Sequence, residues 1–478
     1  MDETPNSIWT LAPAEPAAMD KCGNMESSDS EVLTKRPIRI LRAQVAIIPI
    51  ILISPIVAYV WLGTFSTVTM STGLAEFTPY HSLAGGLMMA ASLHTLLSKL
   101  GLVLGISGFF HSTVTSTLNR AGLRKDSTAQ SIYSTVAPYF TAGIFAGGII
   151  LGLARPRIET GLGVSILDNG GAVRSNSLLP SVVFGALVGF GTKLGNGCTS
   201  GHFLCGLSRF SLRSLVATAT FFGVAVLTHV FNVFNVAKSA TTTQALGSAF
   251  ASRLPATFPK PDLATLLALQ LPALVYLAAP SALQSGEKSD STSKTRAAKQ
   301  LLAAKTMALA VGVHFSFALG VSGMMRPSKV LGFLSLSPAL VSSGKWDPSL
   351  AMVAIGGIIP ASIAYFQQVK PKQDQLRRLG SSSKKSQDAS SRLRPKLSLV
   401  APEWRTPADP SKIDARLVLG AIFFGLGWGA TGLCPGPALA SLASLGAEAV
   451  GRGSMSAVSD LFVFVATMAA SGQLAARI

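Results

Sequence analysis

Two glycine-rich segments, each built around one cysteine, lie deep in apolar sequence: GFGTKLGNGCTSGHFLCGLSR at Gly189–Arg209 and GLGWGATGLCPGPAL at Gly425–Leu439. When Cys198 is aligned with Cys434, two of the preceding glycines also coincide. A shared spacing of this kind indicates two copies of one structural device. The two segments therefore offer the best indication of both fold and function.

The glycine density of these segments predicts broken or re-entrant helices. Each glycine costs a helix about 1 kcal/mol relative to alanine, and within lipid the freed backbone groups need partners from protein or from a cavity. A break directs amide N–H groups and the positive end of a half-helix toward one spot, which suits an anion. Close packing of helices on small residues is the alternative explanation of the glycines.

The composition is that of a membrane protein. Hydrophobic residues make up 49% of the 478 residues and charged residues 13%, whereas soluble domains carry about 25% charged residues. Apolar stretches of membrane-spanning length predict an all-α, polytopic protein with nine or ten transmembrane helices and additional short re-entrant helices. The expected spans are 43–63, 82–99, 135–153, 178–195, 212–234, 263–280, 303–320, 349–366, 416–433 and 456–474.

The net charge of +18 is dispersed over the segments between these spans, which is typical of positive-inside loops rather than of a nucleic-acid surface. We therefore expect the lipid bilayer and no nucleic acid as a partner, with the plasma membrane as the site. Polar stretches divide the chain. The predicted parts are a disordered cytosolic tail (1–40), a first membrane half (41–283), a linker (284–300), and a second membrane half (301–478) with a disordered basic loop (369–412).

A second pair of similar segments supports an internal repeat. The segment LVLGISGFF at Leu102–Phe110 resembles FALGVSGMM at Phe317–Met325, and the alignment pairs Ser107 with Ser322. Each half thus contains one such segment followed by one glycine–cysteine segment. Duplicated halves are common in transporters, where the substrate site lies between the repeats.

The chemistry of the cysteines suggests a soft ligand. Thiol sulfur is polarizable and a weak hydrogen-bond partner, so Cys198 and Cys434 would suit a sulfur-bearing anion, whose charge backbone amides could carry. The donors expected beside them are Gly197, Thr199, Ser200 and Gly436. A buried cysteine that serves only as a small apolar side chain is the expectation for Cys205.

Several polar residues near the motifs complete the predicted substrate site. Lys193 and Arg326 could attract an anion, because charges at membrane depth are costly and usually functional. His202, Ser107 and Ser322 lie in or beside the motifs. The spacing of Cys198, His202 and Cys205 would allow a metal, but no fourth ligand stands nearby. We therefore predict no metal and no cofactor.

Three runs of sequence resemble a known family. GFGTKLGNGCTSGHFLCGLSRFSLRSLVA (189–217) resembles the first component of the two-component permease branch of the YeeE/YedE sulfur-transport family. GVSGMMRPSKVLGFL (320–334) and FGLGWGATGLCPGPAL (424–439) resemble the second component. Both components are fused here, over roughly 78–236 and 303–475.

The resemblance implies an all-helical permease of hourglass-like profile that brings the cysteine loops together at its centre. It implies thiosulfate or a related compound as cargo and Cys198 and Cys434 as thiols that contact it. Thiosulfate permeases of the family are associated with a third cysteine in the pathway; here Ser107, His111 and Ser322 occupy that neighbourhood. Sulfide, sulfite and the export of a persulfide product therefore stay open.

The leading prediction is a permease that passes a small sulfur-containing anion through a central constriction between Cys198 and Cys434. The chain contains no sequence resembling a nucleotide-binding loop, which disfavours ATP-driven transport. The alternative is a membrane thiol enzyme that carries sulfane sulfur as a cysteine persulfide. A third reading is a membrane scaffold, and a homo-oligomeric state stays open.

Overall fold

The computed structural model describes residues 77–123, 132–168, 178–239, 258–282, 293–342, 345–379, 393–406, 413–452 and 456–477. All of them belong to one compact unit. The predicted tail 1–40, the predicted span 43–63 and residues 284–292 of the predicted linker lie outside the described residues.

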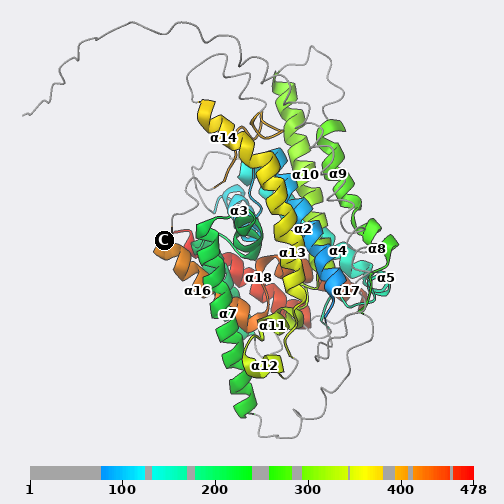
Figure 1. The fold of residues 1–478 in the computed structure, drawn as a ribbon, viewed down its shortest axis with the longest axis vertical. Coiled ribbons are helices and arrows are strands. Elements are labelled where there is room, and N and C mark those ends of the chain that lie inside the picture. Colours follow the sequence, from blue (N-terminus) through cyan, green and yellow to red (C-terminus); the bar gives the residue numbers. More distant parts are fainter. Residues whose placement is uncertain are drawn as a thin grey trace, which may run out of the picture. The chain divides into compact units, whose positions relative to one another are not determined.

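The described part of the chain is helical and contains no β-strand (Figure 1). Its first half contains α2 (Pro79–Leu100), α3 (Ile106–Arg120), α4 (Ile132–Leu153), α5 (Arg155–Leu162), α6 (Leu179–Leu194), the π-helix η1 (Thr199–Gly206), α7 (Leu212–Ser239), α8 (Leu263–Leu269) and α9 (Leu271–Ala282). Its second half contains α10 (Ser293–Val321), α11 (Pro327–Leu334), α12 (Pro338–Ser342), α13 (Ser349–Ala364), η2 (Tyr365–Val369), α14 (Lys370–Leu379), α16 (Ala415–Thr431), α17 (Pro435–Arg452) and α18 (Ser456–Ala475).

Seven of these helical segments are long and apolar enough to cross a membrane. They contain α2, α4, α7, α10, α13, α16 and α18, which correspond to seven of the predicted spans. The stretches predicted at 178–195 and 263–280 form shorter apolar helices, Leu179–Leu194 and Leu263–Ala279. The protein is thus an integral, multi-pass membrane protein of the all-α class.

The long helices of the two halves pack on each other reciprocally. Helix α2 packs on α13 and α10 packs on α4, while α6 packs on α18 and α16 packs on α7. If α2, α4, α6 and α7 are matched in chain order with α10, α13, α16 and α18, the contact of α2 with α13 has its counterpart in that of α10 with α4. The contact of α6 with α18 likewise has its counterpart in that of α16 with α7. The corresponding helices α6 and α16 run antiparallel, because Gly191 faces Phe424 whereas Gly427 faces Val188. The internal repeat remains a prediction, and antiparallel packing of equivalent helices is what an inverted form of it requires.

Glycines allow these helices to approach closely. A Cβ atom on Gly86 of α2 would lie 2.6 Å from the carbonyl oxygen of Val353 on α13, and one on Gly356 would lie 2.5 Å from that of Leu83. Neither backbone can move aside without disturbing its helix, so both positions require glycine. Close packing, the alternative explanation of the glycine-rich sequence, therefore does operate along these helices.

Parts of the predicted basic loop and of the predicted linker are helical or packed on the bundle. Residues 370–379 of the predicted disordered loop form α14, which continues the helix of α13 and η2 with Lys, Gln, Leu and Arg, all good helix formers. Residues 393–406 of the same loop pack beside the end of α2, where the N–H of Leu397 donates to the carbonyl of Lys99 over 3.0 Å. Helix α10 begins at Ser293, inside the predicted linker. Residues 380–392 and 407–412 lie outside the described residues.

Candidate functional site

The two cysteines occupy the same position relative to two helices. Helix α6 ends at Leu194 and η1 begins at Thr199, directly after Cys198; α16 ends at Thr431 and α17 begins directly after Cys434. The carbonyl of Cys198 accepts a hydrogen bond from the N–H of His202 over 2.9 Å, and that of Cys434 accepts one from Ala438 over 3.0 Å. Each cysteine thus caps the N-terminus of the second of two helices that are separated by a short non-helical turn.

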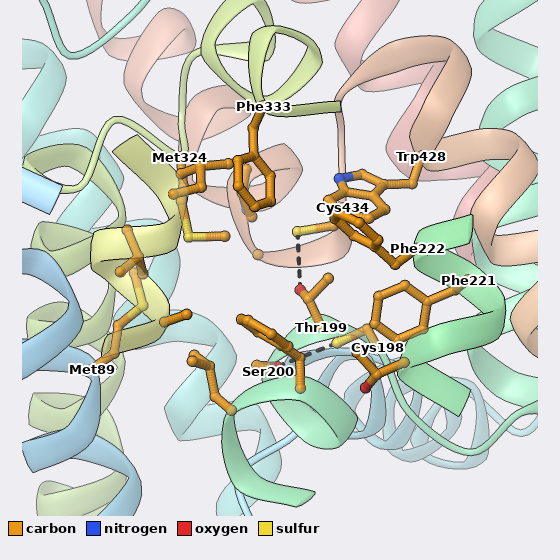
Figure 2. Close-up of a pocket in the computed structure, with 18 of the residues that line it drawn as sticks. Met89, Cys198, Thr199, Ser200, Phe221, Phe222, Met324, Phe333, Trp428 and Cys434 are labelled. Atoms are coloured by element: carbon orange, nitrogen blue, oxygen red, sulfur yellow. Dashed lines mark hydrogen bonds between the residues drawn. The ribbon is translucent and has the colours of Figure 1, made fainter. Parts of the chain in front are cut away.

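Both cysteines line one cavity of about 450 Å³. Its walls come from α2, α3, η1, α7, α10, α11, α13, α16 and α17. Figure 2 shows Cys434 directly above Thr199, with a dashed hydrogen bond between them, and Cys198 and Ser200 below. The helix breaks of both halves therefore meet at a single cavity.

Hydrogen bonds connect the two cysteine segments. The Thr199 hydroxyl donates to Sγ of Cys434 over 3.6 Å, and Sγ of Cys198 lies 3.2 Å from the Ser200 hydroxyl. Ser200 also accepts the N–H of Ile106 at the start of α3 over 3.0 Å. Because Cys198 and Thr199 are consecutive, with Cα atoms about 3.8 Å apart, the two sulfurs lie within about 13 Å of each other. The two thiols therefore belong to one local cluster that is joined through Thr199.

The lining contains no Lys, Arg, His, Asp or Glu side chain among the described residues. Its partial positive charge comes from the N-terminal ends of η1 and α17, which are the attractive ends of the helix dipoles. Gly436, in the first turn of α17, lines the cavity beside Cys434. The cavity thus offers two thiols, the hydroxyls of Thr199, Ser200 and Thr218, and two helix N-termini within otherwise apolar walls.

Sequence reasoning did not identify the thioether and aromatic lining. Met89 of α2 and Met324, between α10 and α11, point into the cavity together with the rings of Phe333 and Trp428 (Figure 2). Met324 belongs to the repeated segment FALGVSGMM, which was the available signal. With the two thiols, the two thioethers give the cavity four soft sulfur atoms.

Of the predicted site residues, Cys198, Cys434, Thr199, Ser200 and Gly436 line this cavity. Each lies at or immediately after one of the two helix breaks that the glycine spacing indicated, and their role in substrate binding stays a prediction.

Three predicted residues of the first motif lie outside the lining. Lys193 is in the last turn of α6, before the break. The ring of His202 turns back toward the break, where Nε2 lies 3.1 Å from the carbonyl of Gly195 and Nδ1 lies 3.3 Å from the Ser214 hydroxyl. Gly197 provides room for that ring, because a Cβ there would lie 2.6 Å from Nε2. His202 and Gly197 therefore support the turn at Cys198 without lining the cavity.

The other three residues also lie outside the lining. Arg326 pairs with Asp168 at 3.0 Å, so its guanidinium joins the start of α11 to the segment after α5. Ser322 is buried, and its hydroxyl donates to the carbonyl of Leu319 over 3.0 Å. Ser107 is buried in α3, and its hydroxyl has no hydrogen-bond partner in the structure.

Cys205 is buried but lines a separate small pocket with Arg209 and Tyr365. No group of three or more His, Cys, Asp or Glu side chains that could hold a metal occurs among the described residues. The spacing of Cys198, His202 and Cys205 does not form such a group, because the His202 ring is directed at Gly195 and Ser214.

Known proteins resemble both parts of the chain. Residues 45–227 match the family described as "Sulphur transport", and residues 304–389 and 389–473 match a family of unknown function (DUF6691). A probable transporter of Xylella fastidiosa strain Temecula1 is 36% identical over 170 residues, which is 34% of this chain and 83% of that protein. The chain belongs to the sulphur-transport family.

Other matches agree with a fused, two-part member of this family. A second probable transporter of the same strain is 34% identical over 143 residues, 30% of this chain and 86% of that protein. A probable transporter of strain 9a5c is 34% identical over 170 residues and is covered to 84%. No solved structure matches the chain. Membership and fold together make the protein a membrane transporter.

Proposed function

We propose that the protein moves a small sulfur-containing anion across the membrane by way of the cavity between Cys198 and Cys434. The observation that carries this proposal is that two helix N-termini, each capped by a cysteine, meet at one cavity. The helix ends would attract the charge of the anion, and the thiols would contact its sulfur. Thiosulfate is the first candidate cargo, and sulfide and sulfite are the others.

The geometry suits passage better than stable binding. The site offers no fixed charge among its lining side chains, so an anion would be held by dipoles and weak thiol contacts alone. Conduction requires a site that attracts its cargo and also releases it. Cys198, Cys434, Thr199, Ser200 and Gly436 would form the contact site, with Met89 and Met324 as additional soft contacts.

Uptake of thiosulfate and sulfide into vesicles that contain the purified protein tests this function. We expect Cys198→Ser and Cys434→Ser to lower the flux at least about tenfold, which corresponds to a rise of about 1.4 kcal/mol in the transition-state free energy. Cys205→Ser is the matched control, because Cys205 is equally buried but lies outside the cavity. Unchanged flux in both cavity variants would rule the proposal out.

The same variants separate transport from the thiol-enzyme alternative. A persulfide on Cys198 or Cys434 that alkylation traps during turnover would favour the enzyme, which needs a thiolate as nucleophile. Lys193 and His202, the basic residues nearest in sequence to Cys198, do not line the cavity. Loss of flux without a trapped persulfide would favour transport.

A further inference from the structure

The cavity reaches the outside of the described part of the chain between α7 and α13. Leu215 of α7 and Ile355 of α13 both line it, yet they are 52% and 46% exposed. By contrast, Cys198 and Cys434 at its inner side are 1% and 4% exposed. The cavity therefore has an apolar mouth on one side and the two thiols at its deep end.

The packing of the helices explains this lateral mouth. Helices α7 and α13 are joined through η1 and α11, each of which contacts both of them. At the α11 end, the rings of Phe222 and Phe333 lie 5.7 Å apart. At the η1 end, Leu204 lies against Gly357 of α13. Figure 1 shows α11 lying between α7 and α13. The mouth is thus a window framed by these four elements.

The surface around the window is that of a lipid-facing helix pair. Helices α7 and α13 both belong to segments that can cross a membrane, and the most apolar stretches of these two are only 22% and 39% buried. Exposed apolar side chains continue along both helices beyond the window, namely Leu212, Leu227 and Phe231 on α7 and Ile359 and Ile363 on α13. The neighbour of such a surface in a bilayer is the acyl region of the lipids.

The interior of the cavity is apolar and therefore also suits the acyl chains of lipids. Its walls expose almost only apolar groups, and among the described lining residues none is charged. Apart from the two thiols and the hydroxyls of Thr199, Ser200 and Thr218, the lining offers few of the polar partners that hold buried water in place. A hydrocarbon chain that enters it would exchange dispersion contacts with neighbouring lipid chains for contacts with the apolar walls.

We propose that an acyl chain of a membrane phospholipid enters between α7 and α13 and lies against Cys198 and Cys434 when no cargo is bound. The chain shields the two thiols from water, and cargo displaces it from the cavity. Entry of the acyl chain does not depend on the proposed transport function, whereas its displacement by cargo rests on that function. Its predicted entrance is lined by Leu215, Ala219, Ala351 and Ile355.

Trp428 provides the probe, because it lines the cavity and is only 5% exposed. The experiment uses the full chain in vesicles of phosphatidylcholine brominated on the acyl chain, with Phe replacing the other four tryptophans (Trp9, Trp61, Trp346 and Trp404). Bromine quenches indole fluorescence only at short range. We expect quenching of Trp428 comparable to that of a tryptophan placed at the lipid-facing position Leu227, in a chain that carries W428F.

A plug in the window tests the route. Ala219 is exposed and lines the cavity mouth, so Ala219→Phe should fill the window and abolish the quenching of Trp428. Ala142→Phe, at an exposed position of α4 outside the cavity, is the matched control and should leave the quenching unchanged. The proposal is overturned if Trp428 is not quenched while the tryptophan at 227 is, or if Ala219→Phe and Ala142→Phe are quenched equally. The measurement reports lipid alone, so it stands whether or not the cysteine variants change flux.

Discussion

Asn196 and Gly432 adopt the same left-handed backbone conformation, with φ of 57° and 71°, and each stands two residues before a cysteine that lines the cavity. This conformation ends α6 and α16 and turns the chain toward the next helix start. Only glycine adopts it freely, and asparagine is one of the few other residues that tolerate it. The same left-handed turn is thus formed by asparagine before Cys198 and by glycine before Cys434.

Substitutions at these positions should differ in a defined way. Asn196→Gly should be tolerated, whereas Asn196→Val should lower the free energy of unfolding by about 1–2 kcal/mol because a β-branched residue resists this conformation. Gly432→Ala should cost more, since its Cβ would also lie 2.7 Å from the carbonyl oxygen of Pro327. The apparent unfolding temperature in detergent measures all three. Equal temperatures for Asn196→Gly and Asn196→Val would contradict the argument.

The glycine–cysteine repeat predicted the central feature of the site from sequence alone. Spacing around Cys198 and Cys434 identified the helix breaks, and their duplication indicated that both would serve one place. Apolar length predicted the long helices, because membrane-spanning segments carry a strong one-dimensional signal.

The remaining features depend on packing that spacing does not encode. Met89 reaches the cavity from α2, which is far from either cysteine in the sequence. Trp428 is close to Cys434 in the sequence, but only the packing of α16 directs its ring into the cavity. Lys193 is five residues from Cys198 in sequence, but the break at the end of α6 separates the two. Arg326 looked available to an anion because its partner Asp168 lies 158 residues away.

Close helix packing makes a second prediction. Gly86→Ala should destabilise the protein by at least about 1–3 kcal/mol, because the added methyl group would press on the backbone of α13 at Val353 and Gly357. Gly223→Ala on α7 is the control: no atom lies within 4 Å of its added Cβ, so it should be neutral or stabilise by about 1 kcal/mol through helix propensity. Comparison of the two unfolding temperatures checks the sign of each effect.

The ion pair of Arg326 with Asp168 is expected to be structural. Asp168 also accepts the N–H of Ser328 over 2.8 Å at the start of α11. Both charged side chains are partly exposed, at 18% and 21%, so their coupling in a double-mutant cycle of Arg326→Ala and Asp168→Ala should be about 1 kcal/mol. Flux measured at saturating cargo should not depend on the Arg326 charge once stability is allowed for. A selective rise in the cargo concentration needed for half-maximal flux would instead restore Arg326 to the substrate site.

Glu159 should make the protein sensitive to acid. Burial alone would raise the pKa of Glu159, but hydrogen bonds from the Ile166 N–H, Arg155 and Ser165 outweigh it and hold the pKa below its usual value. A lowered folded-state pKa gives stability that is present above the ordinary value near 4.3 and is lost as pH falls through the folded-state value.

Unfolding temperatures recorded from about pH 6 to about pH 3 test this dependence. The unfolding temperature of Glu159→Gln should fall less steeply with decreasing pH than that of the parent protein. If the two proteins show the same dependence of unfolding temperature on pH, Glu159 makes no measurable contribution to the acid sensitivity.

His202 and Gly197 should act on flux through the shape of the Cys198 turn. Gly197→Ala places a methyl group 2.6 Å from Nε2 of His202, so either the ring or the turn must move. A displacement of the thiol by about 1 Å should lower the flux about tenfold or more. His202→Ala removes the obstacle together with the ring's hydrogen bonds to Gly195 and Ser214. The double variant should therefore transport no worse than His202→Ala alone, a strongly non-additive result. Additive losses would mean that Gly197 serves the turn by some route other than the histidine ring.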